Sequence, residues 1–145
     1  MAEPVADTTP ALRRYLAYFW YMWGASLCYW GLRTTDRRLF RGGVAAYARA
    51  TRVWPAFAGA HARRGTILSR ELNQHQEGIA AVSQAIVLAP EHADYRLRRG
   101  LIARFHGNAQ TALEDLEYYV AHGESTSWRE EAQRQIALLR EELAA

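Results

Sequence analysis

The hexapeptide Ala-Ile-Val-Leu-Ala-Pro at residues 85–90 ends an amphipathic helical pattern on a proline, which cannot continue a helix. That proline lies 35 residues after Pro55, which follows a similar pattern. Three glycines, Gly31, Gly65 and Gly100, keep nearly the same interval, because they are 34 and 35 residues apart. A fixed period of this size is typical of helical repeats, in which each helix pair buries its apolar face only against its neighbours. The sequence therefore predicts a stack of helix pairs with a long groove for a partner.

The remaining segments also have helical patterns. Apolar side chains recur at steps of three and four residues, and no segment alternates with the period of two that a half-buried strand requires. We therefore predict an all-α fold that follows a flexible tail at residues 1–10. A helix of about 15 residues begins near Leu39 and ends at Pro55. The segments predicted to follow it are helices over 57–72, 75–88, 92–106 and 109–121, and a terminal capping helix over 127–145.

The terminal helix carries its own start signal. Ser127 and Glu130 have the spacing of a capping box, in which the serine accepts from the amide of the glutamate and the carboxylate reaches back. Apolar residues behind it form a single stripe, which suits a helix that closes an array. We assign the nearby acidic residues Glu114, Asp115 and Glu117 to a solvated helix face that serves solubility.

Composition limits the class of protein. With 145 residues the chain is long enough for one domain without a metal or disulfide. Cys28 is the only cysteine, so the chain forms no internal disulfide and no thiolate metal cluster. All 18 basic residues are arginine; residues 33–106 have a net charge of +8 and residues 107–145 a net charge of −5. This polarity could steer an acidic partner or an anionic membrane towards the array.

The periodic residues resemble the tetratricopeptide repeat, a helix–turn–helix unit of 34 residues. The resemblance covers residues 24–123, as about three repeats with a capping helix behind them. Two departures stand in the last repeat, where Tyr119 replaces a small residue and Gly123 replaces the closing proline, and one extra residue lies near Asn73. The matching residues are Trp30, Gly31, Gly43, Tyr47, Ala50 and Pro55 in the first repeat, Gly65, Leu68, Gly78 and residues 85–90 in the second, and Gly100, Gly107, Ala112 and Leu116 in the third.

The resemblance implies a tetratricopeptide-like solenoid whose first helices line a concave partner groove. Its apolar residues and arginine forks would suit an acidic peptide or helix. Arg70 and Arg104 could equally be solvated surface charges. Some family members hold C-terminal carboxylates with lysine and asparagine, and those residue types are absent from the corresponding positions. The implied groove residues are Ala62, Thr66, Ser69, Arg70, Asp94, Leu97, Leu101, Arg104 and Phe105, with Cys28, Leu32, Thr35 and Asp36 in the first repeat.

Residues 11–33 predict a hydrophobic, aromatic-rich helix that merges with the first repeat helix. Three interpretations remain open: the segment spans a membrane, lies in the headgroup region, or packs on protein. An uncharged run of 18 residues, 15–32, reaches about 27 Å, enough for a hydrocarbon core. Spanning helices, however, place tyrosine and tryptophan at their two ends and not in the middle. The predicted membrane or complex contacts are Tyr15, Tyr18, Phe19, Trp20, Tyr21, Trp23, Tyr29 and Trp30.

No catalytic motif stands out in the sequence. The five histidines show no spacing of zinc ligands, and Cys28 lies in an apolar run without an activating base. Basic and aromatic residues do not interleave in a nucleic-acid module. We therefore expect no enzyme activity, no cofactor, no metal and no nucleic-acid partner.

These observations predict a non-enzymatic protein–protein adaptor. Its main form is membrane-associated or a subunit of a membrane complex, and lipid or a membrane-protein complex is then a second partner. The arginine cluster from Arg33 to Arg41 outweighs Arg13 and Arg14, which places the repeats on the cytoplasmic side. The alternative is a soluble cytoplasmic adaptor or assembly factor, in which the aromatic helix packs on the repeats.

Overall fold

The computed structural model describes residues 6–145 of the chain, and this part consists of helices, their connections and an irregular segment before the first helix. The first five residues of the predicted tail lie outside the described range, and residues 6–10 precede the first helix. The prediction of an all-α fold is confirmed. The helices are α1 (Ala11–Thr34), α2 (Arg37–Val53), α3 (Ala58–Leu72), α4 (His75–Leu88), α5 (Ala93–His106), α6 (Ala109–His122) and α7 (Thr126–Ala144).

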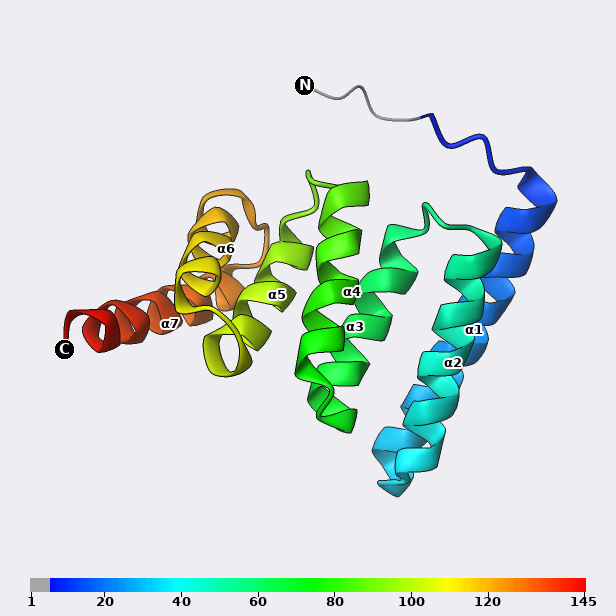
Figure 1. Ribbon diagram of the computed structural model, residues 1–145, viewed down its shortest axis with the longest axis horizontal. Coiled ribbons are helices and arrows are strands. Elements are labelled where there is room, and N and C mark those ends of the chain that lie inside the picture. Colours follow the sequence, from blue (N-terminus) through cyan, green and yellow to red (C-terminus); the bar gives the residue numbers. More distant parts are fainter. Residues whose placement is uncertain (1–5) are drawn as a thin grey trace.

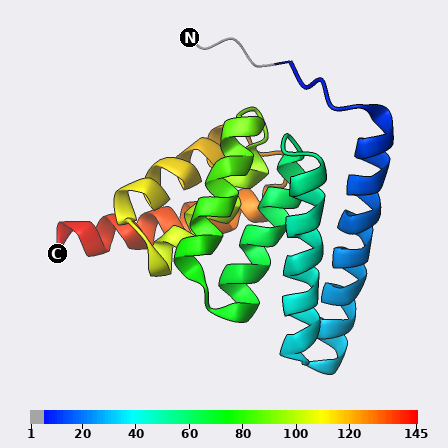
Figure 2. The same cartoon turned by 45° about the vertical axis from the view of Figure 1, so that its right-hand side comes forward.

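The helices form three antiparallel pairs that follow one another along the long axis of the molecule (Figure 1). The pairs are α1 with α2, α3 with α4, and α5 with α6, and the second helix of each pair also packs on the next element of the chain. Helix α1 stands at one outer end with α2 beside it, and α7 closes the other end (Figure 2). The chain is therefore the solenoid that the 34- and 35-residue intervals predict.

The glycines of the interval lie where the two helices of each pair are in close contact. A Cβ atom added to Gly31 would lie 3.0 Å from the ring of Phe40 in α2, and one added to Gly100 would lie 3.0 Å from Leu116 in α6. In the middle pair the contact is between backbones, since a Cβ on Gly65 would lie 2.6 Å from the carbonyl oxygen of Gly78. At Gly65 the backbone leaves no room for a side chain, whereas at Gly31 and Gly100 the neighbouring side chain would have to shift by a few tenths of an ångström.

The turns follow the predicted signals. Trp54 and Ala89, which precede the two repeat prolines, leave the helical conformation, as the residue before a proline tends to do. Asn73 provides the extra turn residue of the middle repeat in a left-handed conformation, with φ 58°. The following amide, of Gln74, donates to the carbonyl of Leu68 at 2.8 Å, so the helix end stays hydrogen-bonded.

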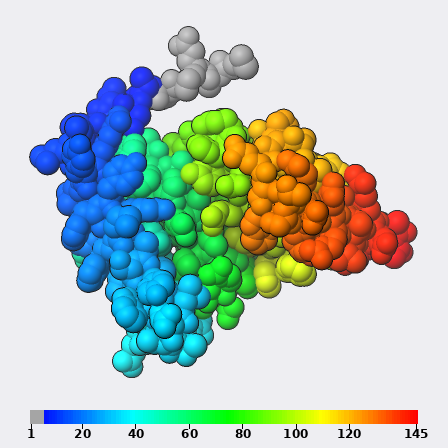
Figure 3. All heavy atoms as spheres, turned by 180° about the vertical axis from the view of Figure 1, so that it is seen from behind, coloured from blue at the N-terminus to red at the C-terminus, as the bar shows by residue number. Residues whose placement is uncertain are grey.

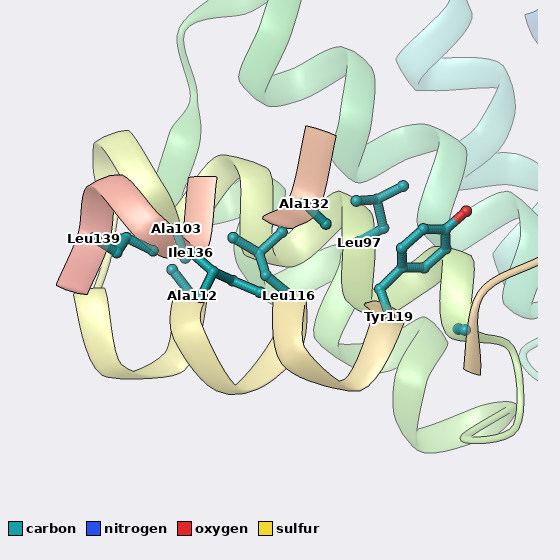
Figure 4. Packing of buried hydrophobic residues seen from close by; sticks show 9 residues of the cluster. Leu97, Ala103, Ala112, Leu116, Tyr119, Ala132, Ile136 and Leu139 are labelled. Carbon is teal, nitrogen blue, oxygen red and sulfur yellow. The ribbon is translucent and has the colours of Figure 1, made fainter. Parts of the chain in front are cut away.

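The two departures from the family pattern in the last repeat compensate for each other. The side chain of Tyr119 is fully buried beside the connection to α7 (Figure 4). A Cβ atom on Gly123 would lie 2.5 Å from the Tyr119 ring, so a larger residue there would require this buried ring to move. Glycine at the position that usually holds proline thus makes room for the large residue.

Helix α7 covers the last pair with its apolar stripe. The core of this end combines residues of three helices (Figure 4): Leu97 and Ala103 of α5, Ala112, Leu116 and Tyr119 of α6, and Ala132, Ile136 and Leu139 of α7. The predicted capping box is wrong, because the helix begins at Thr126 and Ser125 is its N-cap. The Ser125 hydroxyl accepts from the Trp128 amide at 3.5 Å, whereas Ser127 already lies inside the first turn.

The assignment of Asp115 to a solvated face is also wrong, because its side chain is completely buried. Arg99 donates to both of its carboxylate oxygens, at 2.6 and 2.9 Å, and Arg96 donates to one at 3.2 Å. Arg99 also donates to the Ser83 hydroxyl at 3.1 Å. The hydrogen bond to Asp115 raises the pKa of Arg99 above its ordinary value. This network joins α4, α5 and α6.

Replacing Gly65 by alanine tests the backbone contact. Gly65→Ala should lower the free energy of unfolding by about 2 kcal/mol, because the new methyl group meets the backbone of α4. Gly59→Ala is the matched control in the same helix, where the added atom makes an ordinary 3.4 Å contact and alanine favours the helix. Urea unfolding followed by circular dichroism measures both, and equal stability of the two variants would contradict the assigned packing.

Removing the Asp115 carboxylate should be far more costly than removing an exposed acid next to it. Asp115→Ala leaves two partly buried guanidinium groups without their shared partner, so we expect a loss of about 3 kcal/mol. Glu114→Ala removes only an exposed contact with Gln110 and should change stability by less than about 0.5 kcal/mol. Thermal and chemical unfolding of the two variants give the comparison; a Glu114→Ala variant as unstable as Asp115→Ala would overturn it.

Candidate functional site

A groove of about 780 Å³ opens on the side of the odd-numbered helices. Figure 3 shows the molecule from this side, which is the back of the view in Figure 1. Helices α3 and α5 supply most of its lining, and the N-terminal end of α7 closes it. The first helices of successive pairs lie next to each other here because the second helices occupy the opposite side (Figure 1). The lining residues are Arg63, Thr66, Ser69, Arg70, Asn73, His75, Asp94, Leu97, Arg98, Leu101, Ile102, Phe105, His106, Tyr119, Ser125 and Trp128.

Seven of the nine groove residues implied by the family resemblance line this groove, and two do not. The seven are Thr66, Ser69, Arg70, Asp94, Leu97, Leu101 and Phe105. The side chain of Ala62 in α3 is buried and does not line the groove. Arg104 turns towards α7, where its guanidinium donates to both carboxylate oxygens of Glu142 at 2.7 and 2.6 Å. The structure brings the seven together, and their role in binding a partner stays a prediction.

The four residues implied for the first repeat lie elsewhere. Cys28 is buried between α1 and α2, and burial raises the pKa of its thiol. Asp36 is the N-cap of α2, where its carboxylate accepts from the Arg38 amide at 2.8 Å. Leu32 and Thr35 are exposed at the end of α1, outside the groove lining.

Two arginines outside the set of groove residues implied by the resemblance add positive charge to the groove. Arg63 and Arg98 occupy equivalent positions of successive repeats, 35 residues apart, and both face the groove. Within residues 6–145 neither of them forms an ion pair. Every arginine that lies within 4.0 Å of an acid is a different one. The interval itself was the signal that could have identified them.

Arg98 is the more buried of these two arginines. Its guanidinium donates to the Thr66 hydroxyl at 3.1 Å, a neutral partner that does not compensate the charge. Burial lowers the pKa of Arg98, and the charge of Arg63 lowers it further, although Asp94 acts in the opposite direction. A cation held in this way would be stabilised by an anion entering the groove.

The other end of the groove is apolar and aromatic. Leu97, Leu101 and Ile102 lie along α5, while the side chains of Phe105 and Trp128 are 66% and 50% exposed at the rim. Exposed aromatic side chains of this kind are typical anchors in protein interfaces. A ligand that crosses the groove would therefore meet cations at one end and apolar surface at the other.

A histidine stack lies at the edge of the groove, between the start of α4 and the end of α5. The rings of His75 and His106 are parallel, with their centres 3.4 Å apart. His75 also shares a hydrogen bond of 2.9 Å with the buried Ser69 hydroxyl. Desolvation and then the neighbouring His106 lower the pKa of His75. In the described part of the chain no three histidine, cysteine or acidic side chains are grouped so that they could hold a metal ion.

The aromatic residues of α1 divide into two sets. Trp20 and Tyr21 are half-buried, and Tyr21 packs on Tyr47 and Phe57 of the following helices. Tyr18 contacts Trp54 and Phe57 yet stays 48% exposed. The other set is exposed and consists of Tyr15, Phe19, Trp23, Tyr29 and Trp30. Among residues 6–145, no helix has both the length and the apolar character that a membrane crossing requires.

Comparisons with known proteins agree with this architecture. A sequence profile described as the tetratricopeptide repeat matches residues 67–144, which is more than half of the chain. A search of curated protein sequences finds no significant match.

Solved structures of low sequence identity share the fold. The first TPR of Spaghetti (RPAP3), bound to the HSP90 peptide SRMEEVD, superposes with a TM-score of 0.76 at 14% identity, over 99% of this chain and 100% of that one. The TPR domain of Arabidopsis OM64 gives 0.74 at 17% identity, over 90% and 98% of the two chains. The second TPR domain of human RPAP3, in complex with the HSP70 peptide SGPTIEEVD, gives 0.69 at 16% identity, over 86% and 98%.

The helix pairs, their interval and the matching profile lead to one assignment, and they confirm the predicted repeat type. The chain belongs to the tetratricopeptide repeat family.

Proposed function

We propose that the chain is a non-enzymatic adaptor that holds an extended acidic peptide in the groove between α3, α5 and α7. The observation that carries the proposal is the pair of arginines, Arg63 and Arg98, which face the groove without ion-pair partners among residues 6–145. Guanidinium groups bind carboxylates through two parallel hydrogen bonds. Asp94 also lines the groove but forms no ion pair with either arginine, so carboxylates of a ligand would supply the direct partners that these guanidinium groups lack.

The apolar end of the groove supports a peptide ligand over a small anion. Leu101, Phe105 and Trp128 offer contact area to an apolar side chain a few residues away from the acidic ones. Burial of such an anchor contributes most of the affinity in many interfaces, while charge complementarity steers the approach and selects the partner. The proposed ligand therefore combines acidic residues with at least one large apolar residue.

The structural neighbours support this class of ligand. Two of them are complexes with peptides that end in Glu-Glu-Val-Asp, so the fold can hold an acidic peptide. Their identity to this chain is below 20%, so the likeness supports the ligand class and not that particular sequence. Arginine is the only basic residue of this groove other than histidine, since the chain contains no lysine.

The packing of α1 supports the form of the adaptor in which this helix packs on the repeats and does not cross a membrane. Ala17, Gly24, Cys28 and Gly31 of this helix are buried, and they face α2 and the start of α3. Helix α1 thus acts as the first helix of the first pair and not as a separate anchor. We infer that the array works as one interaction module, to which residues 11–33 belong.

Binding of acidic peptides should depend on the two unpaired arginines. We expect fluorescein-labelled SRMEEVD or SGPTIEEVD to bind, and Arg63→Ala or Arg98→Ala to weaken binding about tenfold, because a charged hydrogen bond is lost. Arg41→Ala, an exposed arginine of α2 outside the groove, should change the Kd by less than about twofold. Fluorescence anisotropy at several salt concentrations measures these effects.

Peptides with amides in place of the carboxylates provide the ligand control. They should bind weakly and with little dependence on salt, because they cannot pair with the arginines. If amide and acid forms bind equally, or if Arg41→Ala is as harmful as Arg98→Ala, the groove does not select acidic ligands.

A further inference from the structure

Helix α1 carries an apolar stripe on the side that faces away from the array. Its members recur at steps of three and four residues from Leu12 to Trp23, and Trp30 follows two turns later; they are between 48% and 81% exposed. They extend over 19 residues, or about 27 Å along the helix axis. The stripe, named here the α1 ridge, consists of Leu12, Tyr15, Leu16, Phe19, Met22, Trp23 and Trp30, with Tyr29 at its side.

The array leaves the α1 ridge uncovered. The opposite side of α1 packs on α2 through small residues, among them Gly24, which lies against the backbone of Gly43. Helix α1 also stands at the outer end of the solenoid (Figure 2), and none of its residues lines the groove of α3, α5 and α7. Aromatic residues occur all round α1, but the array covers only one face of the helix. The aromatic residues of the other face are therefore exposed to solvent.

Arginines outnumber acids around the α1 ridge. Residues 8–35 contain no aspartate or glutamate, and of the acids that flank this range Asp7 is paired with Arg14 and Asp36 caps α2. The guanidinium of Arg33 lies over the ring of Tyr29 at 5.9 Å. Beyond the Trp30 end, three further arginines are exposed on the first turns of α2, namely Arg37, Arg38 and Arg41.

We propose that the α1 ridge binds flat on an anionic lipid surface. Tryptophan and tyrosine favour the headgroup region, where the ring meets apolar chains and the polar atom meets water. Arginines beside them are attracted to anionic headgroups. The helix lies along the surface and does not cross it, so the whole array stays on one side and its groove remains open to a peptide.

Two other occupants fit the charge less well. In a symmetric pair of α1 helices, the arginines of the two copies would meet without an acid in residues 8–35 to compensate them. A protein partner would need an apolar site complementary to the α1 ridge, whereas a lipid surface adapts to the shape of what it binds. Charge and shape together favour lipid.

Vesicle flotation tests the proposal with the full chain. We expect binding to vesicles of phosphatidylcholine and phosphatidylglycerol in a 7:3 ratio, and about tenfold weaker binding to phosphatidylcholine alone. The double variant F19S/W23S should lose at least about tenfold in vesicle affinity, because two interfacial side chains are gone. Its melting temperature should not fall, since both side chains are exposed.

Matched controls separate the α1 ridge from other surfaces. Trp128→Ser removes an equally exposed tryptophan in the groove and should leave vesicle binding unchanged. The triple variant R37Q/R38Q/R41Q should weaken binding to the anionic vesicles and not to the neutral ones. The proposal is overturned if the wild-type chain binds no vesicles, if F19S/W23S binds as well as wild type, or if light scattering shows a dimer that F19S/W23S abolishes.

The test of the α1 ridge does not depend on whether the groove binds a peptide. Loss of peptide binding in the Arg98→Ala variant concerns the adaptor proposal alone, and loss of flotation in F19S/W23S concerns the α1 ridge alone. A variant of either kind therefore tests one proposal without the other.

Discussion

The close approach of the two helices in each pair is the constraint on which the rest of the structure depends. At Gly65 and Gly78 the backbones of α3 and α4 touch, and Gly24 and Gly43 bring the backbones of α1 and α2 nearly as close. A pair that is this thin lets the next pair stack on it at a short distance, so the first helices of successive pairs come side by side. The groove exists because these helices share one side of the molecule.

Charge is distributed over this framework in two different ways. Inside the last pair, Asp115 forms ion pairs with Arg96 and Arg99, because burial of a carboxylate without partners would be too costly. Arg98, next to Arg99 in sequence, points into the groove and finds only the Thr66 hydroxyl. Two neighbouring arginines on one turn of α5 therefore have different roles, because Arg99 pairs with a buried carboxylate and Arg98 faces the groove.

Residue intervals were sufficient to predict the repeat fold, because glycine and proline act through the backbone, which is the same in every repeat. Pro55, Pro90 and the extra residue at Asn73 all mark real turns. The orientations of individual side chains were harder to predict from the sequence. Ala62 was chosen where Arg63 faces the groove, since a rotation of 100° about the helix axis separates neighbours and a pattern alone does not fix it. Asp115 and Ser125 depended on contacts between helices, which local sequence does not contain.

The fit between Tyr119 and Gly123 couples two positions of the last repeat. A Cβ atom at 123 would lie 2.5 Å from the Tyr119 ring, so a larger residue there requires the ring to move or to be replaced by a smaller side chain. Redesign of this repeat towards the ordinary closing proline would therefore have to change both positions together.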